Sequence, residues 1–87
     1  MLNVVWSKKA YADYIYWKKN QIEVLRRINR LIENIQEMPF TGLGKPEPLK
    51  HQFQGCWSRR IDREHRIIYK LALEQKQLQI VSCRDHY

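Results

Sequence analysis

After a short apolar stretch at residues 2–6, the apolar positions repeat with the period of a helix. In the second half of the chain they repeat with the period of a strand. Residues 2–6 are rich in β-branched and aromatic side chains, which predicts a short strand. Residues 8–19 follow a favourable N-cap, Ser7, and predict a helix. We expect its apolar side to pack in the core, and this side consists of Ala10, Tyr11, Tyr14, Ile15 and Trp17.

A second, more strongly amphipathic helix is predicted from residue 21 to residue 38. Its apolar stripe recurs every three or four residues and consists of Ile22, Val24, Leu25, Ile28, Leu31, Ile32 and Ile35. Glu23 and Arg27 stand four residues apart, which favours an ion pair on the exposed side. Pro39 ends the helix. Because the link between the helices is very short, they are expected to form an antiparallel hairpin.

The second half of the chain predicts strands after a loop at residues 39–50 that is rich in proline and glycine. The strands are expected at residues 51–53, 57–61, 65–73 and 78–84. Helices grouped before strands are typical of an α+β fold. We therefore predict one small domain of residues 1–87, with an N-terminal strand, a two-helix hairpin and an antiparallel sheet. The helices would cover one face of this sheet and leave the other free for polar residues.

The hairpin between the two central strands sets which side chains face each other. If its loop is the three residues 62–64, Arg60 lies directly opposite Arg66. Two cations in that position repel each other, and a fold tolerates them mainly where an anion lies between them. A loop of two or four residues would separate the pair. Along the last strand, strict alternation predicts that Leu78, Ile80, Ser82 and Arg84 share one face, with Val81 and Cys83 on the other.

The net charge of +7 at neutral pH favours a polyanionic partner, such as a nucleic acid or an acidic protein. The two cysteines, Cys56 and Cys83, are too few for a disulfide scaffold, so we expect reduced thiols in a cytoplasmic protein. The apolar start of the chain ends at Lys8 and Lys9, far short of a signal peptide. We expect no membrane association.

Several polar residues of the second half could together cleave RNA without a metal. This reaction needs a base for the 2′-hydroxyl, cations for the charged transition state and an acid for the leaving oxygen. Glu47 is a candidate base, because Pro46 and Pro48 on either side hold it on a semi-rigid loop. Candidate cations are Lys50, Arg60 and Arg66, and the candidate acid is His86. The alternative interpretation is a surface carboxylate and a frayed terminal histidine.

No other site chemistry is indicated. His51 and His65 have no zinc-type spacing with each other or with the cysteines, and no hydrolase motif surrounds Ser58. We expect no metal and no cofactor.

Five sequence blocks, taken together, resemble the YoeB/Txe family of toxins within the RelE/ParE superfamily. They are VVWSKKAYADYIYW, RINRLIENI, PFTGLGKPEPLKH, GCWSRRIDREHRIIY and the closing CRDHY, and they cover nearly the whole chain in order. The resemblance implies a RelE-like, microbial-RNase-like fold. It also implies a toxin of a type II toxin–antitoxin module, which cleaves messenger RNA in the ribosomal A site by metal-independent attack of the 2′-hydroxyl.

By the same resemblance, Glu47 is the general base, Arg66 stabilises the transition state and His86 is the general acid. The residues implied in binding and orienting RNA are Lys50, Arg59, Arg60 and Tyr87. The implied partners are a cognate antitoxin of the YefM/Phd type, the 70S ribosome, messenger RNA and a second copy of the chain.

The chain departs from the family pattern at Asp85 and Cys56, where aromatic residues are expected, and in a longer last hairpin. We hypothesise that activity survives the acidic residue beside His86. Two alternatives remain open: a non-catalytic inhibitor on the same fold, as in the ParE branch, and an RNA- or ribosome-binding module that does not cleave.

Overall fold

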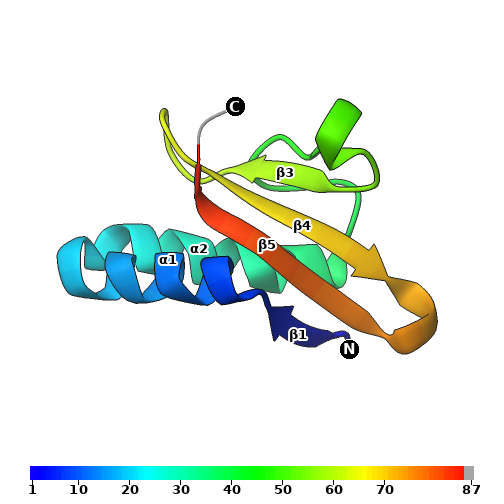
Figure 1. Cartoon of the computed structure of the whole chain (residues 1–87), viewed down its shortest axis with the longest axis horizontal. Coiled ribbons are helices and arrows are strands. Elements are labelled where there is room, and N and C mark those ends of the chain that lie inside the picture. The colour runs from blue at the N-terminus through cyan, green and yellow to red at the C-terminus, as the bar shows by residue number, and fades with distance from the viewer. Residues whose placement is uncertain (86–87) are drawn as a thin grey trace.

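Two helices pack against a five-stranded sheet (Figure 1). The computed structural model describes residues 1–85, and of Asp85 it describes the backbone alone. The elements are β1 (Asn3–Trp6), α1 (Lys8–Asn20), α2 (Ile22–Glu37), β2 (Glu47–Pro48), the 3₁₀-helix η1 (His51–Phe53), β3 (Trp57–Arg60), β4 (Arg66–Ala72), the 3₁₀-helix η2 (Leu73–Gln75) and β5 (Gln77–Asp85). The predicted α+β class, with a strand and a helical hairpin before the main sheet, is confirmed.

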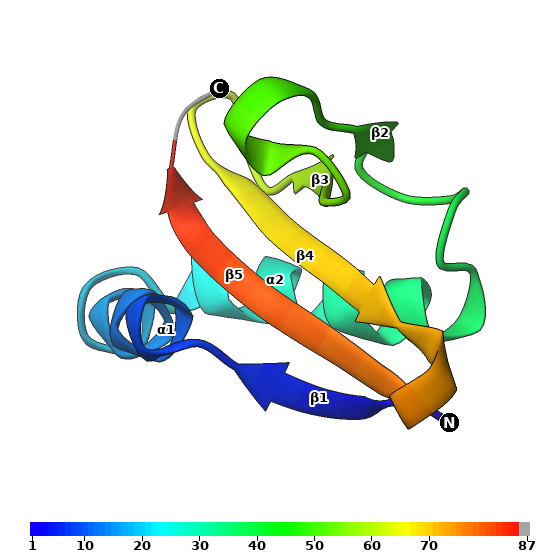
Figure 2. The ribbon, with the colours of Figure 1, turned by 45° about the vertical axis from the view of Figure 1, so that its right-hand side comes forward.

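The sheet has the strand order β1-β5-β4-β3-β2 and is mixed, where the sequence predicted an antiparallel sheet. Strands β2 to β5 pair antiparallel, whereas β1 runs parallel to β5 at one edge. The direction of β1 was not predicted because two helices, and no tight turn, connect it to the other strands. In Figure 2, α2 passes behind the sheet and η1 stands in front of β3, so the two α-helices lie on one face and η1 covers part of the other.

The first helix is capped and tied to the sheet by one side chain. Ser7 Oγ accepts from Ala10 N at 2.9 Å and donates to Val81 O at 2.8 Å. The helix buries Ala10 and Trp17 as predicted, but Tyr11 is 58% exposed. The expectation that Tyr11 belongs to the core is wrong, because each residue turns about 100° around a helix and Tyr11 follows the buried Ala10 directly.

The second helix supplies most of the helical side of the core. Its buried residues are Val24, Leu25, Ile28, Leu31, Ile32 and Ile35. Ile22, in the first turn, is 46% exposed, contrary to the prediction. Glu23 pairs with Arg26 at 2.8 Å, whereas Arg27, its expected partner, donates to Arg60 O at 3.3 Å. Within residues 1–85, no helix has the length and apolar character that crossing a membrane requires.

Residues 51–53, predicted as a strand, form the 3₁₀-helix η1. His51 has a φ of 58°, which is incompatible with extended backbone, and Phe53 N donates to Lys50 O at 3.1 Å. The strand of this region lies earlier, as β2, and it is an edge strand, where a proline without an N–H group is tolerated.

A β-bulge overturns the alternation predicted for the last strand. Two consecutive residues of β4 pair with Ile80 and Ser82, so that Val81 is an extra residue on β5. The side chains beyond the bulge therefore change face. Cys83 is buried in the same core cluster as Leu78 and Ile80, although simple alternation placed it on the opposite face.

A buried arginine connects the sheet, the second helix and the loop between α2 and β2. Arg59 is fully buried, and each of its five N–H groups is donated within the protein. The acceptors are the Tyr69 hydroxyl, Asn34 Oδ1 and the main-chain oxygens of Met38, Thr41 and Leu43. A cation in this position is stable only while these acceptors surround it.

We predict that Arg59→Lys destabilises the protein by about 3 kcal/mol or more, because lysine buries the same charge with fewer donors and leaves acceptors unpaired. Urea unfolding followed by circular dichroism measures this. The matched control is Arg60→Lys at the exposed neighbouring position, which is expected to change stability by no more than about 0.5 kcal/mol. Equal unfolding midpoints for the two variants would contradict the structural role of Arg59.

We also predict that Tyr69 makes the stability of the protein depend on pH in the alkaline range. Its hydroxyl accepts from Arg59 Nε and donates to Pro39 O, both at 3.1 Å. Burial raises the pKa of Tyr69 above its ordinary value of 10.0, against the opposing hydrogen bond and charge of Arg59. The folded protein therefore holds this proton to higher pH than the unfolded chain does. The resulting stability is complete below pH 10.0 and is lost as the pH rises through the folded pKa.

Tyr69→Phe should accordingly be less stable than wild type by about 1–3 kcal/mol near neutral pH. This difference should shrink as the pH rises above 10.0. Urea unfolding of both proteins at these pH values shows whether the stability difference shrinks or grows, since their other titratable groups are the same. A difference that stays constant or grows would show that Tyr69 is not held protonated by burial.

Candidate functional site

Glu47 is displayed at the outer edge of the sheet. It lies in β2 opposite Ser58 of β3, between Pro46 and Pro48, and its side chain is 61% exposed. Its Oε2 atom is 3.4 Å from Arg66 Nη1 on β4. The predicted base and the predicted transition-state cation are therefore brought together, although they lie 19 residues apart in the chain.

The two arginines expected to oppose each other do so. Arg60 pairs with Arg66 in the β3–β4 ladder, so their side chains leave the same face of the sheet. Asp62 fixes the length of the loop, because its Oδ1 accepts from Glu64 N at 2.8 Å and from His65 N at 2.6 Å. This register is the one expected for a three-residue loop, and it excludes the alternatives of two and four residues.

The Glu47 carboxylate is an anion beside one member of this pair, Arg66. The side chain of Arg66 is only 18% exposed, so Glu47 offsets a charge that is largely removed from water. The exposure of Glu47 itself limits the stability that the ion pair contributes to about 0–1 kcal/mol. The pair therefore orients Arg66 more than it stabilises the fold, and it leaves the carboxylate open to a ligand.

The other residues considered for the site, apart from Arg59, are Lys50 and residues 85–87. Lys50 is exposed beside η1, two residues after β2. The backbone of Asp85 pairs with Arg66 at the end of β5. His86 and Tyr87, which follow Asp85 directly, lie outside the described residues.

Arg59 is not part of the site. Consecutive residues of a strand face opposite ways, so Arg60 points to the open face while Arg59 points into the helical side. Its full burial and its five internal hydrogen bonds leave no N–H for a phosphate. The prediction that Arg59 contacts RNA is therefore corrected to a structural role. The pair of adjacent arginines in the sequence carried no mark of which one is buried.

The sequence analysis missed three buried residues on the face of the sheet that bears Glu47. Ser58, Ile68 and Ser82 pair across three neighbouring strands and are almost completely buried. Within residues 1–85, Ser58 Oγ and Ser82 Oγ have no hydrogen-bond partner. The sequence signal available was the run of apolar residues in β4, which has no polar alternation and indicates a strand covered on both faces.

Two other features are separate from this site. A cavity of about 340 Å³ is lined by Met1, Leu2, Gln36, Pro39, Leu73 and Lys76, none of which was a predicted site residue. Among residues 1–85, no group of three or more histidine, cysteine or acidic side chains is placed to hold a metal ion. The chemistry accessible to the described part of the site is therefore that of a carboxylate beside arginines.

Comparison with known proteins places this geometry in a family. The sequence model of the YoeB-like toxins of bacterial type II toxin–antitoxin systems matches residues 6–87. Toxin YoeB of Escherichia coli strain K12 is 44% identical over 86 residues, which cover 99% of this chain and 100% of the relative.

Solved structures agree with the sequence comparison. The YoeB/ParE toxin from Agrobacterium tumefaciens is 42% identical, with a TM-score of 0.95 over 99% of this chain and 100% of that chain. The Staphylococcus aureus protein is 38% identical. It has been solved in a YoeB–YefM complex, with a TM-score of 0.89 over 100% and 99% of the two chains. It has also been solved as a YoeB dimer, with a TM-score of 0.91 over 99% and 98%.

We predict that Arg60→Gln stabilises the protein by about 0.5 kcal/mol at low ionic strength, because it removes the like charge opposite Arg66. The gain should disappear at about 1 M salt, where exposed charges are screened. The control is Arg63→Gln in the exposed loop, which removes the same charge away from the pair. Urea unfolding at both ionic strengths measures the effect, and an equal gain in the two variants would mean that net charge alone is responsible.

Proposed function

The chain belongs to the family of YoeB-like toxins of bacterial type II toxin–antitoxin systems, and we propose that it acts as a ribosome-dependent endoribonuclease on messenger RNA in the A site. The observation that carries the proposal is the Glu47 carboxylate, 3.4 Å from Arg66 Nη1 on the open face of the sheet. An exposed base beside an oriented guanidinium suits cleavage of a phosphodiester by the neighbouring 2′-hydroxyl.

In this mechanism Glu47 takes the proton of the 2′-hydroxyl, whose oxygen then attacks the adjacent phosphorus. Its exposure leaves the carboxylate accessible to a substrate arriving from solvent. Arg66 stabilises the charge that develops on the non-bridging phosphate oxygens, and Arg60, in register with it, binds the same backbone. A guanidinium never deprotonates near neutral pH, so both cations are available throughout the reaction.

His86 is the proposed general acid that protonates the departing 5′-oxygen. It follows Asp85, whose backbone is paired with Arg66, so the chain reaches the site at the residue before it. Lys50 and Tyr87 are proposed to bind and orient the RNA. Together these groups supply a base, a transition-state cation and an acid without a metal, and the products would be a 2′,3′-cyclic phosphate and a 5′-hydroxyl end.

The proposed partners follow from relatives and from charge. A toxin of this family from Staphylococcus aureus has been solved with YefM and also as a dimer. We infer a YefM-type antitoxin and a homodimer for this chain as well. The net charge of +7 suits both ribosomal RNA and an acidic antitoxin segment that would compete for the same cations. Action on ribosomes places the protein in the cytoplasm.

Primer extension on a defined messenger RNA tests the function, using purified protein with and without ribosomes. We predict discrete cuts that require ribosomes. Glu47→Gln should lower the single-turnover rate by about 10²–10⁴-fold, because it removes the base. It should change stability by less than about 1 kcal/mol, because the ion pair is exposed. His86→Gln should lower the rate in the same way by removing the acid.

The matched control is Glu74→Gln in η2, an exposed carboxylate outside the site, which should cleave at the wild-type rate. Ribosome binding without any cleavage by wild type would indicate the non-catalytic alternative. Cleavage by Glu47→Gln at the wild-type rate would instead exclude Glu47 as the base while leaving a nuclease in place.

A further inference from the structure

The last strand departs from its neighbour just before the chain reaches the site. Between the pair Ile68–Ser82 and the pair Arg66–Asp85, one residue of β4 faces two residues of β5, Cys83 and Arg84. A bulge of this kind leaves backbone groups without partners in the ladder. Groups of a buried residue then need hydrogen bonds from elsewhere in the fold.

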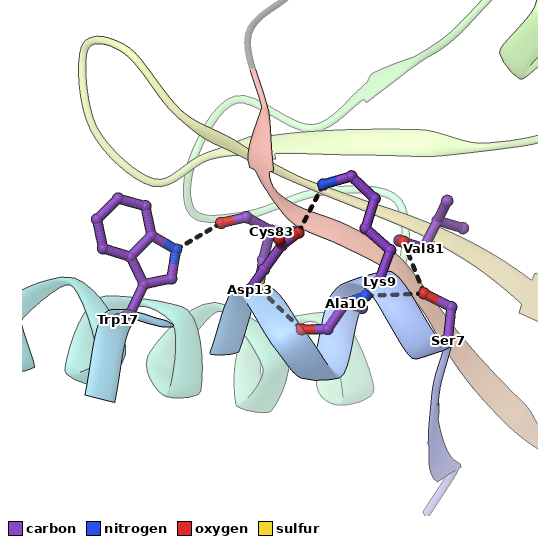
Figure 3. Close-up of polar contacts among 7 residues, drawn as sticks. All are labelled: Ser7, Lys9, Ala10, Asp13, Trp17, Val81 and Cys83. Carbon is purple, nitrogen blue, oxygen red and sulfur yellow. Dashed lines mark hydrogen bonds and ion pairs between the residues drawn. The ribbon is translucent and has the colours of Figure 1, made fainter. Parts of the chain in front are cut away.

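The first helix supplies these partners to Cys83 (Figure 3). Asp13 Oδ2 accepts from Cys83 N at 3.1 Å, and Trp17 Nε1 donates to Cys83 O at 2.8 Å. Asp13 is 7% exposed and Trp17 2%, so both hydrogen bonds are shielded from water. Two side chains on successive turns of α1 thus hold both backbone groups of one residue in the bulge.

The same helix also contacts the residue that follows. The guanidinium carbon of Arg84 lies 3.4 Å from the centre of the Tyr16 ring, which is cation–π geometry. The chain is therefore attached to α1 at two consecutive residues and then returns to pair with Arg66 at Asp85. The last described residue of β5 is placed from both sides, by the helix and by β4.

The buried carboxylate of Asp13 destabilises the fold unless its contacts compensate for the loss of hydration. Burying a charge is unfavourable, and a well-packed apolar side chain would be the cheaper choice in this place. The cationic partner of Asp13 is Lys9, at 2.9 Å, whose side chain is 54% exposed. An apolar side chain at this position could not accept a hydrogen bond from Cys83 N.

We propose that Asp13 is a positioning residue, which together with Trp17 fixes the backbone of β5 up to Asp85, the point from which the chain continues to His86. This inference rests on the proposed function, because it gives the positioned segment its role as carrier of the acid. Asp13 would not touch the RNA itself. It would act through the backbone of Cys83, three residues before His86.

The first test does not depend on activity. Amide hydrogen exchange, followed by NMR, should be at least about tenfold faster at Cys83 in Asp13→Ala than in a control of equal stability. The control is Ile35→Ala, a fully buried position on α2. The urea concentration is set for each variant so that both have the same free energy of unfolding. Equal exchange at Cys83 in the two variants would overturn the proposal.

The second test separates catalysis from binding. With ribosomes in excess, Asp13→Ala and Trp17→Phe should each lower the single-turnover cleavage rate by about tenfold, since the acid is misplaced. The ribosome concentration that gives half the maximal rate should change less than about twofold, because the cationic face is intact. A loss confined to ribosome affinity, or a rate equal to that of Ile35→Ala, would contradict positioning.

A conservative variant covers the case in which Asp13→Ala does not fold. Asp13→Asn keeps an oxygen that can accept from Cys83 N, so it should restore slow exchange at Cys83 and most of the cleavage rate. Exchange in Asp13→Asn as fast as in an unfolded chain would overturn the proposal. Absence of cleavage by wild type would contradict the proposed function alone, and hydrogen exchange would still decide whether Asp13 holds β5.

Discussion

The fold depends on a cation that is fully removed from water. Arg59 is stable inside because neutral acceptors from three parts of the chain surround it: the sheet, the second helix and the connecting loop. Any displacement of one part would leave a buried charge incompletely paired, which costs several kcal/mol. The interaction therefore acts as a geometric constraint, since it can be satisfied in only one arrangement of the three.

This constraint extends to the opposite face of the sheet. The loop that supplies main-chain oxygens to Arg59 continues through Gly44, whose oxygen accepts from Arg60 N at 2.7 Å, and then enters β2. Gly44 has a φ of 79°, and a Cβ there would lie 3.0 Å from Arg60 O. Backbone that passes so close to β3 requires glycine. The position of Glu47 on the open face is thus set by contacts made on the helical face.

The sequence predicted what local rules determine. Helix α2 followed from its apolar period, and a β3–β4 hairpin around residues 62–64 followed from its turn residues, although the length of its loop stayed open. The pairing of Arg60 with Arg66 was expected for a three-residue loop, which is the length that Asp62 fixes in the structure. These features depend on neighbours in the chain, where propensity and turn chemistry operate directly.

The features that were missed depend on residues distant in the chain. Nothing local distinguishes Arg59 from Arg60, because the acceptors that bury Arg59 lie 10 to 25 residues away. The bulge at Cys83 and Arg84 likewise has its hydrogen-bond partners on α1, 66 and 70 residues away in the chain. The left-handed conformation of His51, the first residue of η1, was missed because only a few per cent of non-glycine residues adopt it.

Among the side chains described in residues 1–84, the buried charged ones are Asp13 and Arg59. Each lies behind a segment next to the proposed site: Arg59 behind the two-residue edge strand that carries Glu47, and Asp13 behind the end of β5. An edge strand has a ladder partner on one side only, and the bulged end of β5 has lost part of its pairing with β4. Apolar packing could not restrain them equally well, because it is non-directional, whereas a desolvated charge demands particular partners at particular distances. The two buried charges are therefore best understood as the means by which a small core holds an exposed site in one geometry.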